Sequence, residues 1–305
     1  MAISFKAYAK INLGLRLIEK KQDGYHRIET IFQLISLHDV LTFSKTSQNF
    51  VRIGCSDSSV PLDDENLVSK SYHHLKNEFS FNGGLDVYID KHIPIGGGLG
   101  GGSSNAAVTL NACQKIWNLS ISKEKLHRIA SQIGSDVPFF LYGIPSLGED
   151  HGERLTPLAP LKDFWIVLIC PGFSVSTRWA YSHSRIALTN AQKIGKLRSL
   201  FSETEVHTWR NKLVNELESV VFARHPELHD YKVRLYEQGA FYASMSGSGS
   251  TLFGLFEIQH DAEKAVSFFS KFPVKALLAR TISDRLWNDD GANDLKMREG
   301  DHGNH

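Results

Sequence analysis

The chain begins with a strict alternation of apolar and polar side chains. Every odd position from Ile3 to Leu17 is apolar. Polar side chains occupy the even positions in the first part of this run: Lys6, Tyr8, Lys10 and Asn12. A period of two residues places alternate side chains on opposite faces of a β-strand. The pattern therefore predicts one long strand over residues 3–17, with one face in the core and the other in contact with water.

Hydrophobic spacing predicts a strand-rich first half with inserted helices. Short apolar or alternating runs predict strands near residues 40–43, 51–55 and 85–90. Apolar side chains three or four positions apart predict helices near residues 66–76, 106–117 and 123–133. Ser122 and Gly134 are the expected start and stop signals of the last helix. Ser103 or Ser104 is the expected N-cap of the helix before it.

The second half predicts a different arrangement. Its pattern indicates a strand, a helical region, two strands, a helix and a final strand, at residues 165–170, 177–238, 240–246, 251–256, 261–271 and 274–280. This β-α-β-β-α-β order is typical of a ferredoxin-like sandwich. The segment 143–152 is rich in glycine and mixed in charge, so we expect it to join two domains, residues 1–150 and 151–287. Residues 288–305 are polar and aperiodic, which predicts a disordered tail.

Composition limits the class of protein. The 305 residues are 42% hydrophobic, and 34 Lys and Arg nearly balance 33 Asp and Glu. Such a balance provides no general attraction to nucleic acid or to an anionic membrane, so neither is an expected partner. No apolar run is long enough to span a bilayer and no signal peptide is evident, which predicts a cytoplasmic protein. Cys55, Cys113 and Cys170 lack metal-ligand spacing and are expected to be buried, reduced thiols.

A glycine-rich loop carries the clearest chemical signal. Six glycines fall within residues 96–102, between the predicted strand 85–90 and the predicted helix that follows. Without Cβ atoms, backbone N–H groups can converge on an anion, and a helix N-terminus adds free donors and partial positive charge. The flanking elements argue against a flexible linker, and no Gly-Lys-Ser/Thr closes a Walker A motif. The loop therefore predicts a phosphate site whose cationic side chain comes from elsewhere.

Five separated segments resemble the GHMP small-molecule kinases. They are Ala9–Leu13, Asp23–His26, Pro94–Ala107, Gly134–Phe140 and Met245–Ser250. The resemblance implies an α+β, two-domain GHMP kinase fold, with an N-terminal ribosomal protein S5 domain 2-like domain and a ferredoxin-like C-terminal domain. It also implies transfer of the ATP γ-phosphoryl group to an alcohol. Within the family, the segments most resemble members that act in isoprenoid precursor synthesis and whose acceptor carries a cytidine diphosphate group.

Two residues are implied by this resemblance to be catalytic, Lys10 and Asp136. By residue type alone, Lys10 could be an ordinary surface lysine, and Asp136 could cap the helix that follows it. The resemblance implies that Asp136 is the base for the acceptor hydroxyl and that Lys10 steadies the transferred phosphoryl group. Asn215-Glu216-Leu217-Glu218 departs from the Asn-Asp pair common in the family, and we expect little consequence for the chemistry.

The resemblance also implies the binding residues. For ATP they are Asn66, Lys91, Pro94, Ile95, Gly96, Gly97, Gly98, Leu99, Gly100, Gly101, Gly102, Ser103 and Ser104. For the acceptor they are Asn12, Tyr25, His26, Thr177, Gly247, Ser248 and Gly249. ATP is the expected co-substrate, and Mg²⁺ is expected with Ser104 as one ligand. By residue type, Asn66 could instead cap a helix and Lys91 could be a solvated charge.

Two other functions remain open at this stage. The first is a different GHMP kinase, acting on homoserine, a sugar or a mevalonate-pathway alcohol, against which the Asp23–His26 turn argues. The second is a nucleotide-binding sensor without transfer activity, against which the presence of both Lys10 and Asp136 argues. A monomer and a homodimer are both compatible with the sequence.

Overall fold

The computed structural model of the chain describes residues 2–20, 26–184, 196–202 and 206–282. The Asp23-Gly24 turn, Tyr25 and the tail 288–305 lie outside the described residues. Within the described residues, no helix combines the length and the apolar character needed to cross a membrane.

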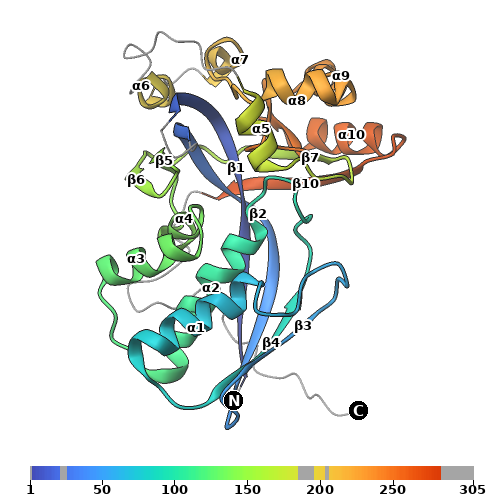
Figure 1. Ribbon diagram of the computed structural model, residues 1–305. Coiled ribbons are helices and arrows are strands. Elements are labelled where there is room, and N and C mark those ends of the chain that lie inside the picture. Colours follow the sequence, from blue (N-terminus) through green and yellow to red (C-terminus); the bar gives the residue numbers. More distant parts are fainter. Residues whose placement is uncertain (1, 21–25, 185–195, 203–205, 283–305) are drawn as a thin grey trace, which may run out of the picture.

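Two long antiparallel strands run through the molecule, β1 (Ala2–Lys20) and β2 (His26–Thr46) (Figure 1). The predicted strand 3–17 is confirmed as part of β1, whereas the predicted strand 40–43 is only one piece of β2. The expectation of a water-facing side on β1 is wrong at its centre, where Lys10 and Asn12 are only 4% and 2% exposed. Later parts of the chain cover these positions, which no local pattern reveals.

Strand β2 pairs with β1 along one edge, and its opposite edge is long enough to pair with several other strands in succession. It pairs with β4 (Gly84–Asp90) and, further along, with β5 (Ser146–Asp150). Strand β3 (Val51–Cys55) lies parallel to β4, and β6 (Arg154–Pro157) pairs with β5.

The segment 143–152 is therefore not a simple linker. Its residues form β5, which is held in the sheet by β2 on one side and by β6 on the other. A boundary at residue 150 would divide the β5–β6 hairpin. Glycine and mixed charge in this segment accompany a strand of the sheet, and the division into domains 1–150 and 151–287 stays a prediction.

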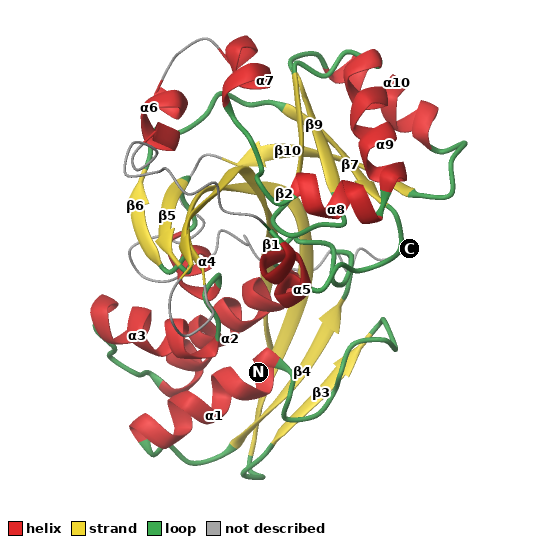
Figure 2. Cartoon of the chain, turned by 45° about the horizontal axis from the view of Figure 1, so that its top comes forward, coloured by secondary structure: helices red, strands yellow, loops and turns green. Residues whose placement is uncertain are grey.

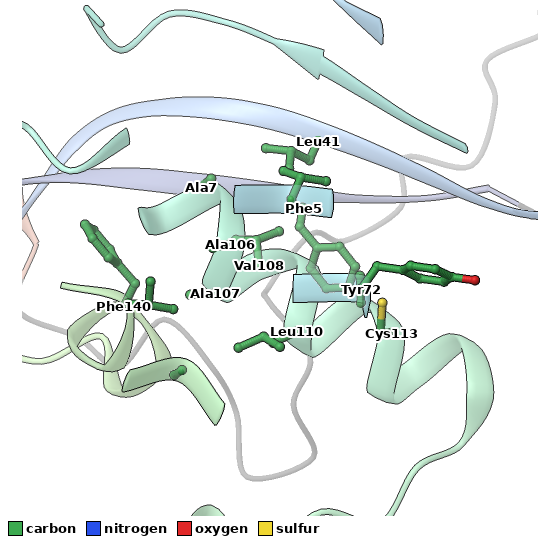
Figure 3. Close-up of a cluster of buried hydrophobic side chains, with 14 of the residues drawn as sticks. Phe5, Ala7, Leu41, Tyr72, Ala106, Ala107, Val108, Leu110, Cys113 and Phe140 are labelled. Atoms are coloured by element: carbon green, nitrogen blue, oxygen red, sulfur yellow. The ribbon is translucent and has the colours of Figure 1, made fainter. Parts of the chain in front are cut away.

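Four helices pack beside the long strands (Figure 1). They are α1 (Leu67–Phe79), α2 (Gly101–Trp117), α3 (Lys123–Ile133) and α4 (Val137–Tyr142). Apolar side chains of the strands and of α1 and α2 form one buried cluster that includes Phe5, Phe43, Tyr72 and Leu110. Figure 3 shows side chains of this cluster gathered between the strands and the helices.

The helix termini test the expected caps. Ser122 accepts a hydrogen bond from the Lys125 N–H at the start of α3, as predicted, and α3 ends before Gly134. The expectation of Ser103 or Ser104 as the cap of α2 is wrong, because α2 begins earlier and its N-cap is Gly100. Both serines therefore lie near the start of the helix, where the Ser104 N–H donates to the Gly100 carbonyl oxygen at 2.9 Å.

The second half forms an antiparallel sheet in the order β10-β7-β9-β8. Its strands are β7 (Trp165–Cys170), β8 (Tyr242–Met245), β9 (Leu252–Phe256) and β10 (Lys275–Ile282). Figure 2 shows three helices beside this sheet, α8 (Glu218–Arg224), α9 (Pro226–Glu237) and α10 (Gln259–Phe269). This order confirms the ferredoxin-like arrangement.

The two sheets are continuous through β10. Its residues Thr281 and Ile282 pair with Ile35 and Leu34 of β2. Three shorter helices, α5 (Thr177–His183), α6 (Lys196–Ser202) and α7 (Trp209–Lys212), and one turn of 3₁₀ helix, η2 (Val206–Thr208), complete the described elements. The central strands thus carry residues from the first half directly to the second.

The cysteines are free thiols. Cys113 and Cys170 are buried, as expected, and burial raises the pKa of the Cys170 thiol to about 11. Cys55 at the end of β3 is only partly buried, so the expectation is wrong for that residue.

Truncation of Phe43 is expected to destabilise the fold strongly. Its ring is fully buried and lies 6.0 Å from the Phe5 ring, so Phe43→Ala leaves a cavity and should lower the free energy of unfolding by about 3–5 kcal/mol. The control is Phe50→Ala, at a ring that is 47% exposed, with an expected change within about 0.5 kcal/mol. Equal losses in equilibrium urea unfolding would contradict this assignment of the core.

Candidate active site

A cavity of about 960 Å³ lies where the glycine loop, the centre of β1, the α3–α4 junction and α5 meet. It is lined by Lys10, Asn12, Leu15, His26, Ile28, Thr30, Phe32, Gly98, Gly100, Ser103, Ser131, Gly134, Ser135, Asp136, His151, Glu153, Thr177, Arg178, Tyr181, Ser182, Gly247 and Ser248. Residues from both halves of the chain therefore share one cavity.

Lys10 and Asp136 meet in this cavity. The Lys10 Nζ lies 3.3 Å from Asp136 Oδ2 and donates a 2.6 Å hydrogen bond to Asn12 Oδ1. Asn12 Nδ2 donates to the Thr30 hydroxyl, which in turn donates to the Gly14 carbonyl oxygen. A buried ammonium group needs such partners, since transferring an unpaired charge from water is costly. The chain of bonds holds the Lys10 cation beside the Asp136 carboxylate.

Asp136 does not act as a capping residue. It occupies the N-cap position of α4, but its backbone is in the right-handed helical region and its side chain makes no capping hydrogen bond. An N-cap side chain normally accepts from an N–H of the first turn. The alternative that Asp136 serves only as a cap is therefore not supported, and its carboxylate is directed to Lys10 instead.

The glycine loop approaches Lys10 closely. The Lys10 N–H donates to the Leu99 carbonyl oxygen at 3.0 Å. Gly100 has a φ of +71°, and a Cβ there would lie 2.7 Å from the Phe140 ring and 3.1 Å from the Lys10 side chain. Both the backbone conformation and the lack of space require glycine. The loop thus brings the N-terminus of α2 close to Lys10, the cation that the resemblance implied.

The hairpin between β8 and β9 closes the cavity from the second half. The Ser246 hydroxyl donates to the Gly98 carbonyl oxygen at 2.9 Å, and the Thr251 N–H donates to that of Gly97 at 3.2 Å. A Cβ on Gly98, where φ is +78°, would overlap the Ser246 carbonyl oxygen. Gly247 and Ser248 line the cavity as expected, whereas Gly249 does not line it.

The segment 215–218 positions this hairpin. Buried Asn215 donates from Nδ2 to the carbonyl oxygens of Met245 and Gly247, both at 2.8 Å. Glu218 Oε1 accepts from the Met245 N–H, while Glu216 Oε2 accepts from the Leu17 N–H on β1. The Asn215–Glu218 segment, which departs from the Asn-Asp pair of the family, therefore supports the hairpin and β1. Neither Glu216 nor Glu218 lines the cavity.

Lys91 is a buried ion-pair partner, so the alternative of a solvated charge is wrong. Its Nζ lies 2.8 Å from Asp39 Oδ2 and donates to the Ile93 carbonyl oxygen at 2.6 Å, with the side chains of Lys91 and Asp39 6% and 0% exposed. Asp39 Oδ1 accepts from the N–H groups of His92 and Ile93. This pair holds the start of the glycine loop against β2.

The other residues expected to bind ATP divide into two groups. Gly98, Gly100 and Ser103 line the cavity. The remaining ones, Asn66, Pro94, Ile95, Gly96, Gly97, Leu99, Gly101, Gly102 and Ser104, do not line it. Asn66 caps α1, with Oδ1 accepting from the Val68 N–H at 2.9 Å, which supports its structural alternative.

The expected magnesium ligand is not well placed. Ser104 is only 2% exposed, and its neighbour Ser103 is the serine that lines the cavity. Within the described residues, no group of three or more His, Cys, Asp and Glu side chains could hold a metal ion.

Two aromatic side chains, His26 and Tyr181, form an aromatic wall that lines part of the cavity. The ring centroids of His26 and Tyr181 are 5.5 Å apart and the rings are inclined by 40°. Burial lowers the pKa of the His26 imidazole, and the Lys20 charge lowers it further, so the ring is neutral at pH 7. Burial raises the pKa of the Tyr181 phenol, as does the Asp136 charge, and the hydroxyl stays protonated. Thr177 and Ser248 bring their hydroxyl oxygens within 3.0 Å, joining α5 to the hairpin.

Several lining residues were not predicted from the sequence. Thr30 and Phe32 share one face of β2, just as Lys10 and Asn12 share one face of β1. Tyr181 follows Thr177 by one helical turn. For these residues the sequence therefore contained a weak indication that they line the site. His151 and Glu153 lie in the β5–β6 turn, and nothing in their spacing connects them to residues more than a hundred positions earlier.

The fold and the cavity define a small-molecule kinase of the GHMP class. The sequence matches the GHMP kinases N terminal domain over residues 66–144 and the GHMP kinases C terminal domain over residues 187–275. A crystal structure of 4-(cytidine 5'-diphospho)-2C-methyl-D-erythritol kinase superposes with a TM-score of 0.76 and 31% identity, covering 92% of this chain and 100% of that one.

Sequence relatives give the narrower family. A 4-diphosphocytidyl-2-C-methyl-D-erythritol kinase of Prosthecochloris aestuarii is 41% identical over 88% of this chain and 94% of its own length. One of Enterococcus faecalis is 37% identical over 92% of this chain and 100% of its own length. The chain belongs to the GHMP kinases and, within them, to the family of 4-diphosphocytidyl-2-C-methyl-D-erythritol kinases.

Asp39→Asn is expected to impair both stability and ATP use. Removing one partner leaves the Lys91 charge buried and uncompensated, which costs about 3–5 kcal/mol, and loosens the start of the glycine loop. We expect a lower free energy of unfolding and a higher KM for ATP. Asp86→Asn is the control, because its ion pair with Arg52 is exposed and should contribute less than about 1 kcal/mol. Equal behaviour of the two variants in urea unfolding would refute the buried-pair assignment.

Proposed function

We propose that this chain transfers the γ-phosphoryl group of ATP to the 2-hydroxyl of 4-diphosphocytidyl-2-C-methyl-D-erythritol. The observation that carries the proposal is the Lys10–Asp136 pair, which faces the glycine loop inside one cavity. Phosphoryl transfer needs positioning and charge stabilisation more than covalent chemistry from the protein. A paired cation and carboxylate beside a phosphate loop supply both requirements.

Asp136 is the proposed base. Its carboxylate is 28% exposed towards the cavity, so it can accept the proton of the acceptor hydroxyl as the oxygen attacks the γ-phosphorus. The new O–P bond forms while the bond to the β-phosphate bridging oxygen breaks, and ADP leaves. The proton remains on Asp136 until solvent removes it.

Lys10 is the proposed electrostatic stabiliser. Its ammonium group is buried and held by Asn12, so little reorganisation is needed when negative charge develops on the transferred phosphoryl oxygens. The N–H groups of the loop and of the first turn of α2 are the proposed phosphate donors. Mg²⁺ is proposed to accompany ATP, and when bound it would neutralise phosphate charge.

The wall formed by His26 and Tyr181 is the proposed cytosine site. A neutral imidazole can hydrogen-bond the edge of a base, and aromatic faces support base stacking. The proposed role of Tyr25 rests on the sequence, where it precedes His26. Free thiols favour a reducing compartment, which supports a proposed cytoplasmic location.

The fold alone does not select the acceptor. A homoserine kinase from Cytophaga hutchinsonii and a mevalonate kinase from Methanococcus jannaschii superpose with TM-scores of 0.74 and 0.73 at 20% and 13% identity. Against these alternatives stand the aromatic wall and the names of the relatives that cover most of the chain. Against a sensor without activity stands the assembled Lys10–Asp136 pair.

Loss of either catalytic group is expected to reduce turnover. Asp136→Asn and Lys10→Ala should each lower kcat by roughly 10²-fold or more, the scale of a lost general base or charge stabiliser. Coupled ADP-release assays with both substrates saturating measure the rate. ATP binding by Asp136→Asn should remain close to that of the parent protein, while its unfolding transition should shift to lower urea concentration, because the buried Lys10 ammonium group loses its counter-charge. A parent-like kcat in Asp136→Asn would contradict the proposed mechanism.

His26→Ala is expected to weaken the acceptor selectively. Base stacking contributes about 1–3 kcal/mol, so kcat/KM for the acceptor should fall about 5- to 150-fold while KM for ATP is unchanged. Because the His26 pKa is lowered, acceptor KM in the parent protein should be constant above pH 7 and rise only below about pH 6.5. Methylerythritol phosphate without cytidine should be a poor acceptor and no worse for the variant. An effect confined to ATP would exclude the cytosine site.

A further inference from the structure

Helix α5 presents one polar face to the cavity. The side chains that line it are Thr177, Arg178, Tyr181 and Ser182. These positions are separated by one, three and one residues, which places them on one side of an α-helix. The other charged or aromatic residues of α5, Trp179 and His183, do not line the cavity. Arg178 is therefore aligned with residues already connected to the site.

Arg178 differs from Lys10 in having no counter-charge. Within the residues that the structure describes, no carboxylate lies within ion-pair distance of Arg178, whereas Lys10 contacts Asp136 and Asn12. Of the other ionisable lining groups, His26 is neutral at pH 7, and Glu153 accepts from the His151 N–H. The Arg178 guanidinium is thus available to an anion that enters the cavity.

The contacts of helix α5, which carries Arg178, indicate which anion. The Thr177 hydroxyl lies 3.0 Å from that of Ser248 on the hairpin. The Tyr181 ring lies 5.5 Å from the His26 ring. Arg178 is therefore on the helix that contacts both the hairpin and the aromatic pair that the proposed reaction uses.

We propose that Arg178 binds the diphosphate of the acceptor and so helps the enzyme select a nucleoside-diphosphate-linked alcohol. This inference rests on the proposed function, because it places the base at His26 and Tyr181 and the reacting hydroxyl at Asp136. The linker between them is then a diphosphate. A guanidinium group presents a planar set of donors that matches phosphate oxygens. The exposed position of Arg178 on α5 leaves its side chain free to reach such a group.

The proposed role of Arg178 predicts which kinetic constants change when its side chain is lost. The diphosphate is not altered in the reaction, so Arg178 interacts with it equally in the ground state and in the transition state. Losing such an interaction raises KM and leaves kcat unchanged. A purely structural role of Arg178 would instead change stability, or alter kcat and both KM values together.

The first test measures acceptor kinetics of Arg178→Gln with saturating ATP. We expect acceptor KM to rise about 10-fold or more, with kcat within about twofold and KM for ATP unchanged. Arg178→Lys keeps the charge without the planar donor set, so its acceptor KM should lie between those of the parent protein and of Arg178→Gln. Arg52→Gln on β3 is the matched control, since Arg52 pairs with Asp86 and is not among the residues that line the cavity. An unchanged acceptor KM in Arg178→Gln overturns the proposal.

The second test separates the diphosphate contact from the base contact. With a non-hydrolysable ATP analogue filling the nucleotide site, the parent protein should bind cytidine 5'-diphosphate more tightly than cytidine. Arg178→Gln should lose most of this difference and keep the affinity for cytidine. An equal loss for both ligands would assign Arg178 a role in folding α5 and overturn the proposal.

The activity of the parent protein distinguishes a failure of the proposed function from a failure of the proposed role of Arg178. Failure of the parent to phosphorylate the cytidine-diphosphate acceptor refutes the proposed function itself. Normal parent activity with an unaffected Arg178→Gln variant refutes only the role of Arg178.

Discussion

The buried ammonium group of Lys10 is the constraint on which the rest of the site depends. A lysine in the interior is tolerated only when charged or polar partners replace the water it has lost. Here Asp136 supplies the charge and Asn12 the hydrogen bond, and Thr30 fixes Asn12 in turn. These partners come from three strands or helices, so the alignment of β1, β2 and the start of α4 is tied to the geometry of one cation.

Close backbone approach is the second condition for assembling the site. The glycine loop lies between Lys10 and the β8–β9 hairpin, and Gly98 contacts that hairpin where a Cβ atom would overlap it. Asn215 holds the hairpin from the opposite side. The glycines that are proposed to free N–H groups for phosphate also allow the two halves of the chain to touch. The proposed binding role and the packing therefore both require glycine here.

The proposed roles divide the residues of the cavity into two groups. Lys10 and Asp136, beside the glycine loop, are proposed to act on the transferred phosphoryl group, and His26 and Tyr181 are proposed to recognise the acceptor. The homoserine kinase and mevalonate kinase structures share the fold, so the fold by itself does not determine the acceptor. Helix α5 connects the two ends through Thr177 and Ser248.

Sequence patterns succeeded where the deciding interactions are local. The period of β1, the Ser122 cap and the strand order of the second half all depend on neighbouring residues, and all are confirmed. The predictions that failed depend on distant ones. The polar face of β1 is buried by the glycine loop and the β8–β9 hairpin. Residues 146–150 of the expected linker form β5, which pairs with β2. Helix α2 begins at Gly101, so neither Ser103 nor Ser104 caps it.

By itself, the sequence supplied the candidate residues for the chemistry, since a glycine run, a lysine on a strand and an aspartate before Val-Pro-Phe-Phe are present whatever the packing. Only the tertiary structure decided their partners. Asp136 meets Lys10, Lys91 meets Asp39, and Arg178 joins a wall with His26, although each of these pairs is separated by 52 or more positions. Periodicity reports the environment of adjacent residues, whereas burial and pairing of charges are set by contacts between segments that the chain brings together only on folding.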